Sequence, residues 1–167
     1  KYPISLISVE FITADKLMSL YNSEPDVNVI ITLADQAITL GKQNEYVTLI
    51  NIAEYYKFIT DSSGNLLKGI FESNVRDYQG SNSVNSCIAD TLRNKDTADF
   101  WWLNNGITIL SDKITLITNR QLSIDNPEVV NGLQTSREIY NYFSESKDKL
   151  NNESRNVLVR FIVPDSE

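Results

Sequence analysis

The segment spanning residues 129–137 constrains the fold of this chain most strongly. A β-branched run ends there in Asn131-Gly132, and apolar residues then recur at helical spacing as far as Phe143. The pattern predicts a strand that passes directly into a helix over residues 133–143. Such a junction leaves backbone N–H groups without acceptors at the N-terminus of the helix, where they form a ready site for an anion.

Carboxamide side chains gather in three clusters of the sequence, two of which also carry an arginine. The clusters are Asn74-Val75-Arg76-Asp77, residues 100–108 and residues 129–137. Asn and Gln carry both a hydrogen-bond donor and an acceptor and do not titrate, so they suit the edge of a planar ligand. We predict that the clusters converge on one ligand-binding pocket, lined by Asn74, Arg76, Asn104, Asn105, Asn131, Gln134, Thr135 and Arg137.

Each arginine also has a purely structural interpretation. Arg137 falls one turn into the predicted helix, where it can add a bidentate contact to a bound phosphate. Alternatively, it pairs with Glu138 or Asp148 on the surface. Arg76 projects to the same face of an extended chain as Asn74, or it pairs with a neighbouring carboxylate.

The second cluster contains two adjacent tryptophans followed by Asn104-Asn105-Gly106. Asn and Gly tolerate the left-handed backbone region, so this tripeptide predicts a sharp turn. Trp101 and Trp102 cannot both point the same way. One interpretation places one ring in the core and the other at a groove, where it could stack on a base. The other places both in the core.

Two absences narrow the chemistry. The 167 residues include no histidine, which removes imidazole bases and imidazole metal ligands. The glycine patterns of P-loop and Rossmann phosphate sites are also missing. Any metal would have to be held by carboxylates alone, which allows Mg²⁺ and gives no zinc site. The aspartates at positions 77, 99, 112 and 125 are scattered, so we name no catalytic residue, no metal ligand and no cofactor.

Composition is that of an ordinary globular protein, with 41% hydrophobic and 22% charged residues. The net charge of −7 argues against a broad face that tracks a nucleic-acid duplex, since that affinity comes from many cationic contacts. The single cysteine, Cys87, excludes an internal disulfide and fits a reducing compartment. We therefore expect a cytoplasmic protein without a membrane segment, and we leave its oligomeric state open.

The order of the patterns predicts an α+β fold, in which helices pack on a mixed sheet and the second half forms antiparallel hairpins. Residues 107–110 and 113–118 are expected to pair with each other across Ser111-Asp112, and residues 121–124 are expected to pair next. Further strands are predicted over residues 4–12, 27–33, 46–50 and 157–163, and further helices over residues 14–21, 52–59 (capped by Asn51) and 84–92.

The chain is expected to be a single domain and a fragment of a longer protein, because it begins with Lys1 and stops just after a predicted strand. Residues 1–65 alternate strand and helix and carry few polar clusters, which is typical of a supporting scaffold. Residues 66–167 carry the motifs. Two local expectations complete the prediction: Cys87 is a small core residue on one side of its helix, and residues 147–155 are polar and exposed.

The motifs resemble the AIPR family, the abortive-infection phage-resistance proteins of bacteria. The similar segments are Phe71 to Gly80 (FESNVRDYQG), Phe100 to Ile109 (FWWLNNGITI) and Val129 to Ser136 (VVNGLQTS), in the same order and separation. Members are longer, often with an amino-terminal region that resembles a restriction endonuclease. The resemblance implies a cytoplasmic role in defence against phage or other foreign DNA.

A second resemblance concerns the strand-to-helix junction alone. Val129 to Arg137 is similar to the Asp-Gly-Gln-His-Arg signature of ParB-like and DGQHR-type domains, in which the turn meets a nucleotide phosphate. In this sequence Asn131 replaces the aspartate, one extra residue intrudes and the histidine is missing.

Three hypotheses follow for function. The first is a nucleotide- or nucleic-acid-binding module of a phage-defence protein. In the second, the domain recognises the target of a nuclease whose catalytic carboxylates lie outside this segment, so we leave open whether the protein is an enzyme. The third is a non-catalytic interaction scaffold, in which the motif side chains are buried and satisfied by internal hydrogen bonds.

Overall fold

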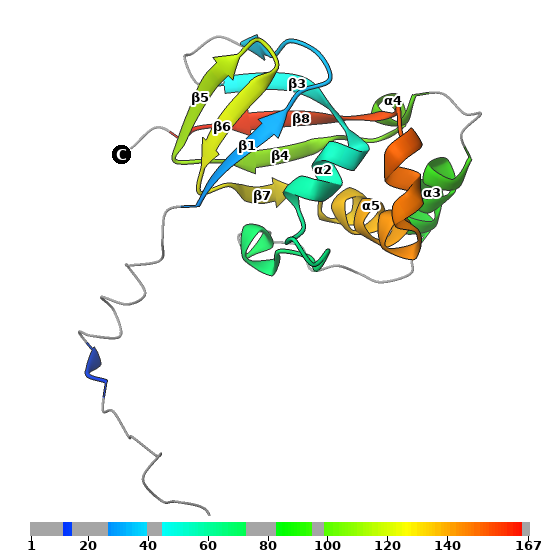
Figure 1. Ribbon diagram of the computed structural model, residues 1–167, viewed down its shortest axis with the longest axis horizontal. Helices are drawn as coiled ribbons and strands as arrows, with labels where there is room; N and C mark the ends of the chain where they lie inside the picture. The colour runs from blue at the N-terminus through cyan, green and yellow to red at the C-terminus, as the bar shows by residue number, and fades with distance from the viewer. Residues whose placement is uncertain (1–11, 15–26, 40–44, 73–82, 95–98, 165–167) are drawn as a thin grey trace, which may run out of the picture.

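The computed structural model describes residues 12–14, 27–39, 45–72, 83–94 and 99–164. These residues form two sheets with helices packed on them, which confirms the predicted mixed α+β class (Figure 1). The strand predicted over residues 4–12 and the helix over residues 14–21 fall almost entirely outside the described residues. No helix in the described part of the chain is long and apolar enough to cross a membrane.

The larger sheet has five strands in the order β2-β3-β8-β4-β7. β8 runs parallel to β4, and the other neighbours are antiparallel. β8 is central, and Val157, Val159 and Phe161 alternate along it with complete burial, as expected for a strand that packs one face on the core. The strands are β2 (Ile38–Thr39), β3 (Glu45–Asn51), β4 (Ile107–Leu110), β7 (Glu128–Asn131) and β8 (Asn156–Ile162).

The smaller sheet has three antiparallel strands in the order β1-β6-β5, namely β1 (Asn28–Thr32), β6 (Gln121–Asp125) and β5 (Lys113–Thr118). Its inner face carries Ile31, Leu122 and Ile124, all at most 2% exposed. β5 and β6 pair as the sequence predicts, and residues 119–120 form the turn between them.

The predicted hairpin between β4 and β5 is wrong, because the two strands belong to different sheets. The Ser111 N–H donates to Ile162 O at the end of β8, whereas the next N–H, of Asp112, donates to Asp125 O at the end of β6. The buried Ser111 hydroxyl lies 2.8 Å from Lys113 O and 2.6 Å from Asp125 O, so it fixes the corner. Residues 111–112 therefore carry the chain from one sheet to the other.

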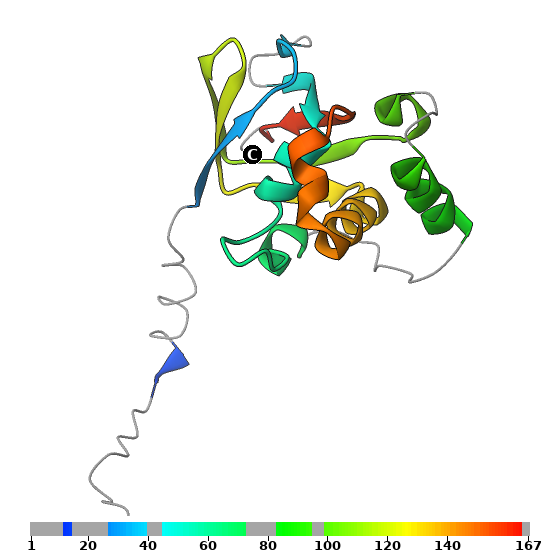
Figure 2. The ribbon, with the colours of Figure 1, turned by 45° about the vertical axis from the view of Figure 1, so that its right-hand side comes forward.

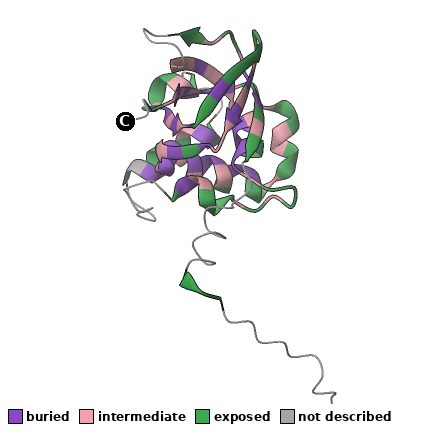
Figure 3. Cartoon of the chain, turned by 90° about the vertical axis from the view of Figure 1, so that its left-hand side faces the viewer, coloured by how far each residue is buried: buried purple, intermediate pink, exposed green. Residues whose placement is uncertain are grey.

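The helices gather beside the larger sheet, with buried residues filling the space between the layers (Figures 2 and 3). α2 (Ile52–Phe58) is capped as predicted by Asn51, whose side-chain oxygen accepts from the Ala53 N–H at 2.9 Å. α5 packs on α2, with the Tyr56 and Phe143 rings 5.3 Å apart, and it also contacts α3. The remaining elements are η2 (Lys68–Phe71), α3 (Ser83–Arg93), α4 (Phe100–Leu103), α5 (Leu133–Glu145) and η3 (Lys147–Asn152).

Two local expectations need correction. Cys87 is exposed on α3, while Ile88 and Leu92 of the same helix are buried. The polar segment before β8 is not wholly exposed either, because the Glu153 side chain is only 1% exposed and lies 2.7 Å from an Arg155 nitrogen. A charged pair that packs against α3 and a solvated loop have the same local polarity in the sequence. Local polarity therefore cannot distinguish the two.

Candidate functional site

The junction between β7 and α5 is held close to the neighbouring strand by a glycine. Gly132 has φ +95°, and a Cβ there would lie 2.8 Å from Ile107 Cγ1 of β4. Gly106, at the start of β4, has φ +76°, and its Cβ would meet Leu158 O of β8 at 2.7 Å. Both positions combine a left-handed backbone with a close approach, so only glycine fits without a shift of the sheet. The two Asn-Gly turns are thereby brought side by side.

Among the described residues, no side chain caps the N-terminus of α5. Counting from the start of α5, the Ser136 N–H is the first to make a hydrogen bond of the helical pattern. It donates to Gly132 O at 2.9 Å. The N–H groups of Leu133, Gln134 and Thr135 therefore have no intrahelical acceptor. They carry the positive end of the dipole of a helix that runs to Glu145, with no acidic residue in its first turn.

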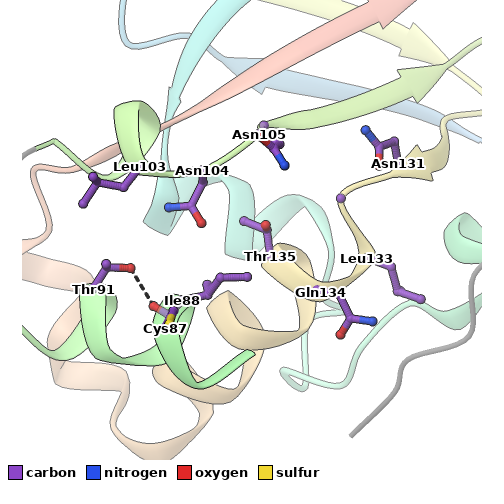
Figure 4. Close-up of a pocket in the computed structure, with 12 residues that line it drawn as sticks. Cys87, Ile88, Thr91, Leu103, Asn104, Asn105, Asn131, Leu133, Gln134 and Thr135 are labelled. Carbon is purple, nitrogen blue, oxygen red and sulfur yellow. Dashed lines mark hydrogen bonds between the residues drawn. The ribbon is translucent and has the colours of Figure 1, made fainter. Parts of the chain in front are cut away.

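These amides lie at a cavity of about 330 Å³ between α3, the turn after α4 and the start of α5 (Figure 4). Its walls combine carboxamides with apolar side chains, and none of the described lining residues is charged. The lining residues are Cys87, Ile88, Thr91, Leu103, Asn104, Asn105, Gly106, Asn131, Gly132, Leu133, Gln134 and Thr135.

Two polar groups of α5, on residues that line this cavity, have no hydrogen-bond partner among the described residues. Thr135 is 6% exposed, and among the described residues nothing hydrogen-bonds to its hydroxyl. Gln134 Oε1 is buried and likewise has no partner in the described part of the chain. Burying a polar atom without a hydrogen bond costs about 1–3 kcal/mol, and such atoms are rare in folded proteins.

The two asparagines of the preceding turn behave differently from each other. The Asn104 Nδ2 group donates to Phe100 O at 2.8 Å, which ties the turn to the first residue of α4. Asn105 is exposed, and its backbone oxygen accepts from Arg160 Nη1 at 3.1 Å. The Asn104 side chain is therefore fixed in place, while the exposed side chain of Asn105 makes no hydrogen bond to the described residues.

Five of the eight predicted ligand-binding residues line this one cavity: Asn104, Asn105, Asn131, Gln134 and Thr135. Arg137 is half-buried one turn further along α5, makes an interaction of its own and does not line the cavity. Asn74 and Arg76 lie outside the described residues. The role of all eight in binding stays a prediction.

Sequence reasoning missed the wall that α3 contributes. Cys87, Ile88 and Thr91 line the cavity because α3 packs against α5. No motif in α3 signals this, since the contact depends on how two distant helices meet. Of the tryptophan pair, Trp101 is half-buried and Trp102 is 72% exposed, with the rings 5.1 Å apart and nearly perpendicular. The fully buried ring of that helix is Phe100.

Within the described residues, no group of three or more Asp, Glu or Cys side chains lies close enough to hold a metal ion. Burial raises the pKa of Tyr55 well above its ordinary value, but this hydroxyl is bonded to Ser136 Oγ at 2.8 Å behind the cavity wall. The arrangement is therefore one of neutral donors and acceptors around a helix N-terminus.

The family model of the AIPR proteins matches residues 71–167. The match covers more than half of the chain and includes the whole of α3, α4 and α5, so the chain belongs to the AIPR family. Membership confirms the resemblance seen in the motifs and implies a context of abortive infection and phage resistance. No curated protein and no solved structure matches the chain.

Proposed function

We propose that this chain is a nucleotide- or nucleic-acid-binding module of a phage-defence protein, and that the cavity at the N-terminus of α5 is its binding site. The observation that carries the proposal is the set of donors at that helix end. Three backbone N–H groups lack intrahelical acceptors, and the hydroxyl of Thr135, a residue that is only 6% exposed, hydrogen-bonds to none of the described residues. A phosphate oxygen would satisfy these donors and gain from the helix dipole.

The rest of the cavity suits a flat ring with polar edges. Ile88, Leu103 and Leu133 supply apolar surface, and the carboxamides of Asn104 and Gln134 stand among them. A mostly apolar pocket with a few placed polar groups is the usual form of a small-molecule site, and 330 Å³ falls at the lower end of the usual size range. A nucleotide supplies both a phosphate for the helix end and a ring for this wall.

A single nucleotide or an unpaired strand fits better than a duplex. The chain has a net charge of −7, and the described lining of the cavity contains no charged side chain. Duplex binding draws its affinity from many cationic contacts to phosphates. One helix N-terminus offers a place for one phosphate group.

The scaffold hypothesis makes the opposite demand on the same residues. It requires the motif side chains to be satisfied internally, as Asn104 Nδ2 is. The Thr135 hydroxyl and Gln134 Oε1 lack such partners among the described residues, which favours the binding hypothesis over the scaffold.

The test is thermal melting of the chain against ATP, CTP, GTP, UTP, short single strands and a duplex, each with and without Mg²⁺. A ligand that binds only the native state at about 100 times its Kd adds ~2.7 kcal/mol of stability. We expect a rise in Tm with at least one nucleotide or single strand, and a loss of most of that rise in Thr135→Val. Thr115→Val, on the exposed face of β5, is the matched control. A flat response to every ligand would contradict the proposal.

A further inference from the structure

The side-chain amide of Asn104 has its orientation fixed by one hydrogen bond. Its nitrogen end lies 2.8 Å from Phe100 O, and a carbonyl oxygen can only accept. The NH₂ group must therefore face Phe100, which leaves Oδ1 as the group turned towards the cavity. Figure 4 shows this oxygen directed into the space between Asn104 and Thr135. Asn104 thus presents an acceptor to any ligand.

Reversing the amide would be costly in two places. It would put Oδ1 against Phe100 O, so that two acceptors would face each other, and it would remove the bond that ties α4 to the turn. Each lost or opposed hydrogen bond is worth about 1 kcal/mol or more. The acceptor at Asn104 is therefore a fixed feature of the site and cannot adapt to the ligand.

Gln134, in the first turn of α5, does not add a second acceptor to the open cavity, because its side-chain oxygen has no accessible surface. Its Oε1 is buried and has no partner among the described residues, and the side chain lines the same cavity. The Asn104 side of the cavity therefore offers an acceptor, whereas the end of α5 offers donors. A complementary ligand carries an acceptor or anion at one end and N–H donors at the other.

We infer that the ligand carries an exocyclic amino group that donates to Asn104 Oδ1. On the proposed function, from which this inference follows, the site prefers amino-bearing nucleobases to their oxo counterparts, that is, cytosine to uracil and adenine to hypoxanthine. An oxo group at that position would face Asn104 Oδ1 with a second acceptor and would leave both unsatisfied. Asn104 is then the residue that determines base specificity.

The experiment is isothermal titration of the chain with two matched pairs, CMP against UMP and AMP against IMP. Short strands are titrated in parallel, oligocytidylate against oligouridylate and oligoadenylate against oligoinosinate. The two members of each pair differ in one exocyclic group, which is amino in one and oxo in the other. The oxo member also carries a proton on the neighbouring ring nitrogen. We expect the amino member of at least one pair to bind about tenfold tighter or better, the ratio that ~1.4 kcal/mol produces.

The variant Asn104→Ala tests whether Asn104 produces this preference for the amino member. It is expected to bring the two members of the pair within about twofold of each other, while Asn119→Ala, in the exposed turn between β5 and β6 and away from the cavity, keeps the preference. Equal binding of both members by the unmodified chain would overturn the inference and leave the proposed function standing, as would a preference for the oxo member. A ratio that survives Asn104→Ala would overturn the role of Asn104, and an absence of binding by all eight ligands would overturn the proposed function itself.

Discussion

Two regions of the molecule bury polar groups in opposite ways. Behind α3, the Arg155 guanidinium donates to Thr91 O at 3.0 Å, to Leu92 O at 2.8 Å and to both carboxylate oxygens of Glu153. It also lies 3.3 Å from the Tyr142 hydroxyl. The nitrogens of this cluster are directed at acceptors, and the hydrogen bonds with Glu153 raise the pKa of Arg155 further.

In front of α3, the Thr135 hydroxyl and Gln134 Oε1, on residues that line the cavity, have no partners among the described residues. Thr91 belongs to both regions. Its carbonyl oxygen accepts a hydrogen bond from Arg155, and the residue also lines the cavity. The two regions therefore differ in role. The Arg155 cluster joins α3 to the residues before β8 and to α5, so it holds the fold, whereas on the proposed function the polar groups of the cavity bind a ligand.

The largest effect is expected from breaking the Arg155 cluster. Arg155→Met leaves the Glu153 carboxylate buried without its cation, and removing one partner of a buried pair costs about 3–5 kcal/mol. Urea unfolding measures this loss. The double variant Glu153→Gln/Arg155→Met is expected to lose less than Arg155→Met alone, because no buried charge remains. A single variant within about 1 kcal/mol of the unmodified chain would show that the cluster does not hold the fold.

The floor of the cavity can be tested with a matched pair of glycines, both in the left-handed region. An alanine Cβ at Gly106 would lie 2.7 Å from Leu158 O, in the backbone of the central strand. At Gly64 the nearest atom is Lys147 Nζ at 3.1 Å, the end of a flexible side chain. We expect Gly64→Ala to cost about 1 kcal/mol and Gly106→Ala about 3 kcal/mol, by the same unfolding measurement. Equal losses would contradict the close contact of the Asn-Gly turn with β8.

Ser136, next to Thr135 on α5, lies behind the cavity wall, and its hydroxyl has hydrogen-bond partners. Its hydroxyl lies 2.8 Å from the Tyr55 hydroxyl and 2.8 Å from Gly132 O. Ser136→Ala leaves the completely buried Tyr55 hydroxyl without a partner, which is expected to cost about 1–3 kcal/mol. Calorimetric Tm and urea unfolding should both report the loss. An unchanged stability would mean that Tyr55 finds another partner.

Tyr55 also predicts a dependence of stability on alkaline pH. Burial raises the pKa of Tyr55 above that of the unfolded chain, and the bond from Ser136 offsets only part of this. The native state therefore keeps the phenol proton at a pH where the unfolded state has lost it. The stabilisation is fully present below pH ~10 and is lost as the pH rises above that, by up to about 1.4 kcal/mol per pH unit. Tyr55→Phe should flatten this part of the curve, and an equally steep curve would contradict the burial argument.

The elements that depend on local signals were predictable from sequence. The Asn51 cap, the hairpin of β5 and β6, and the strand-to-helix junction before α5 follow from capping residues, turn residues and periodicity. Asn104 and Asn131, whose clusters were predicted to converge, both line one cavity, because β4 pairs antiparallel with β7 and brings Thr108 opposite Asn131.

Features set by tertiary packing were not predictable. Alternating residues in β4 and β5 indicate two strands but not the sheet to which each belongs, which the buried Ser111 decides. Cys87 has the spacing of a core residue, yet α3 turns that position towards the cavity, where it is exposed. The Arg155 cluster is invisible in the sequence for the same reason, since its acceptors lie in α3 and α5.

The most direct test of the contrast between the two regions is the free energy of unfolding of Thr135→Val without ligand, with Ser136→Ala measured beside it. If the Thr135 hydroxyl is kept for a ligand, its removal takes away no hydrogen bond, and the variant should stay within about 0.5 kcal/mol of the unmodified chain or gain stability. A loss above about 1 kcal/mol, comparable with that of Ser136→Ala, would mean that the hydroxyl already holds the fold. That result would contradict the assignment of this cavity as a binding site.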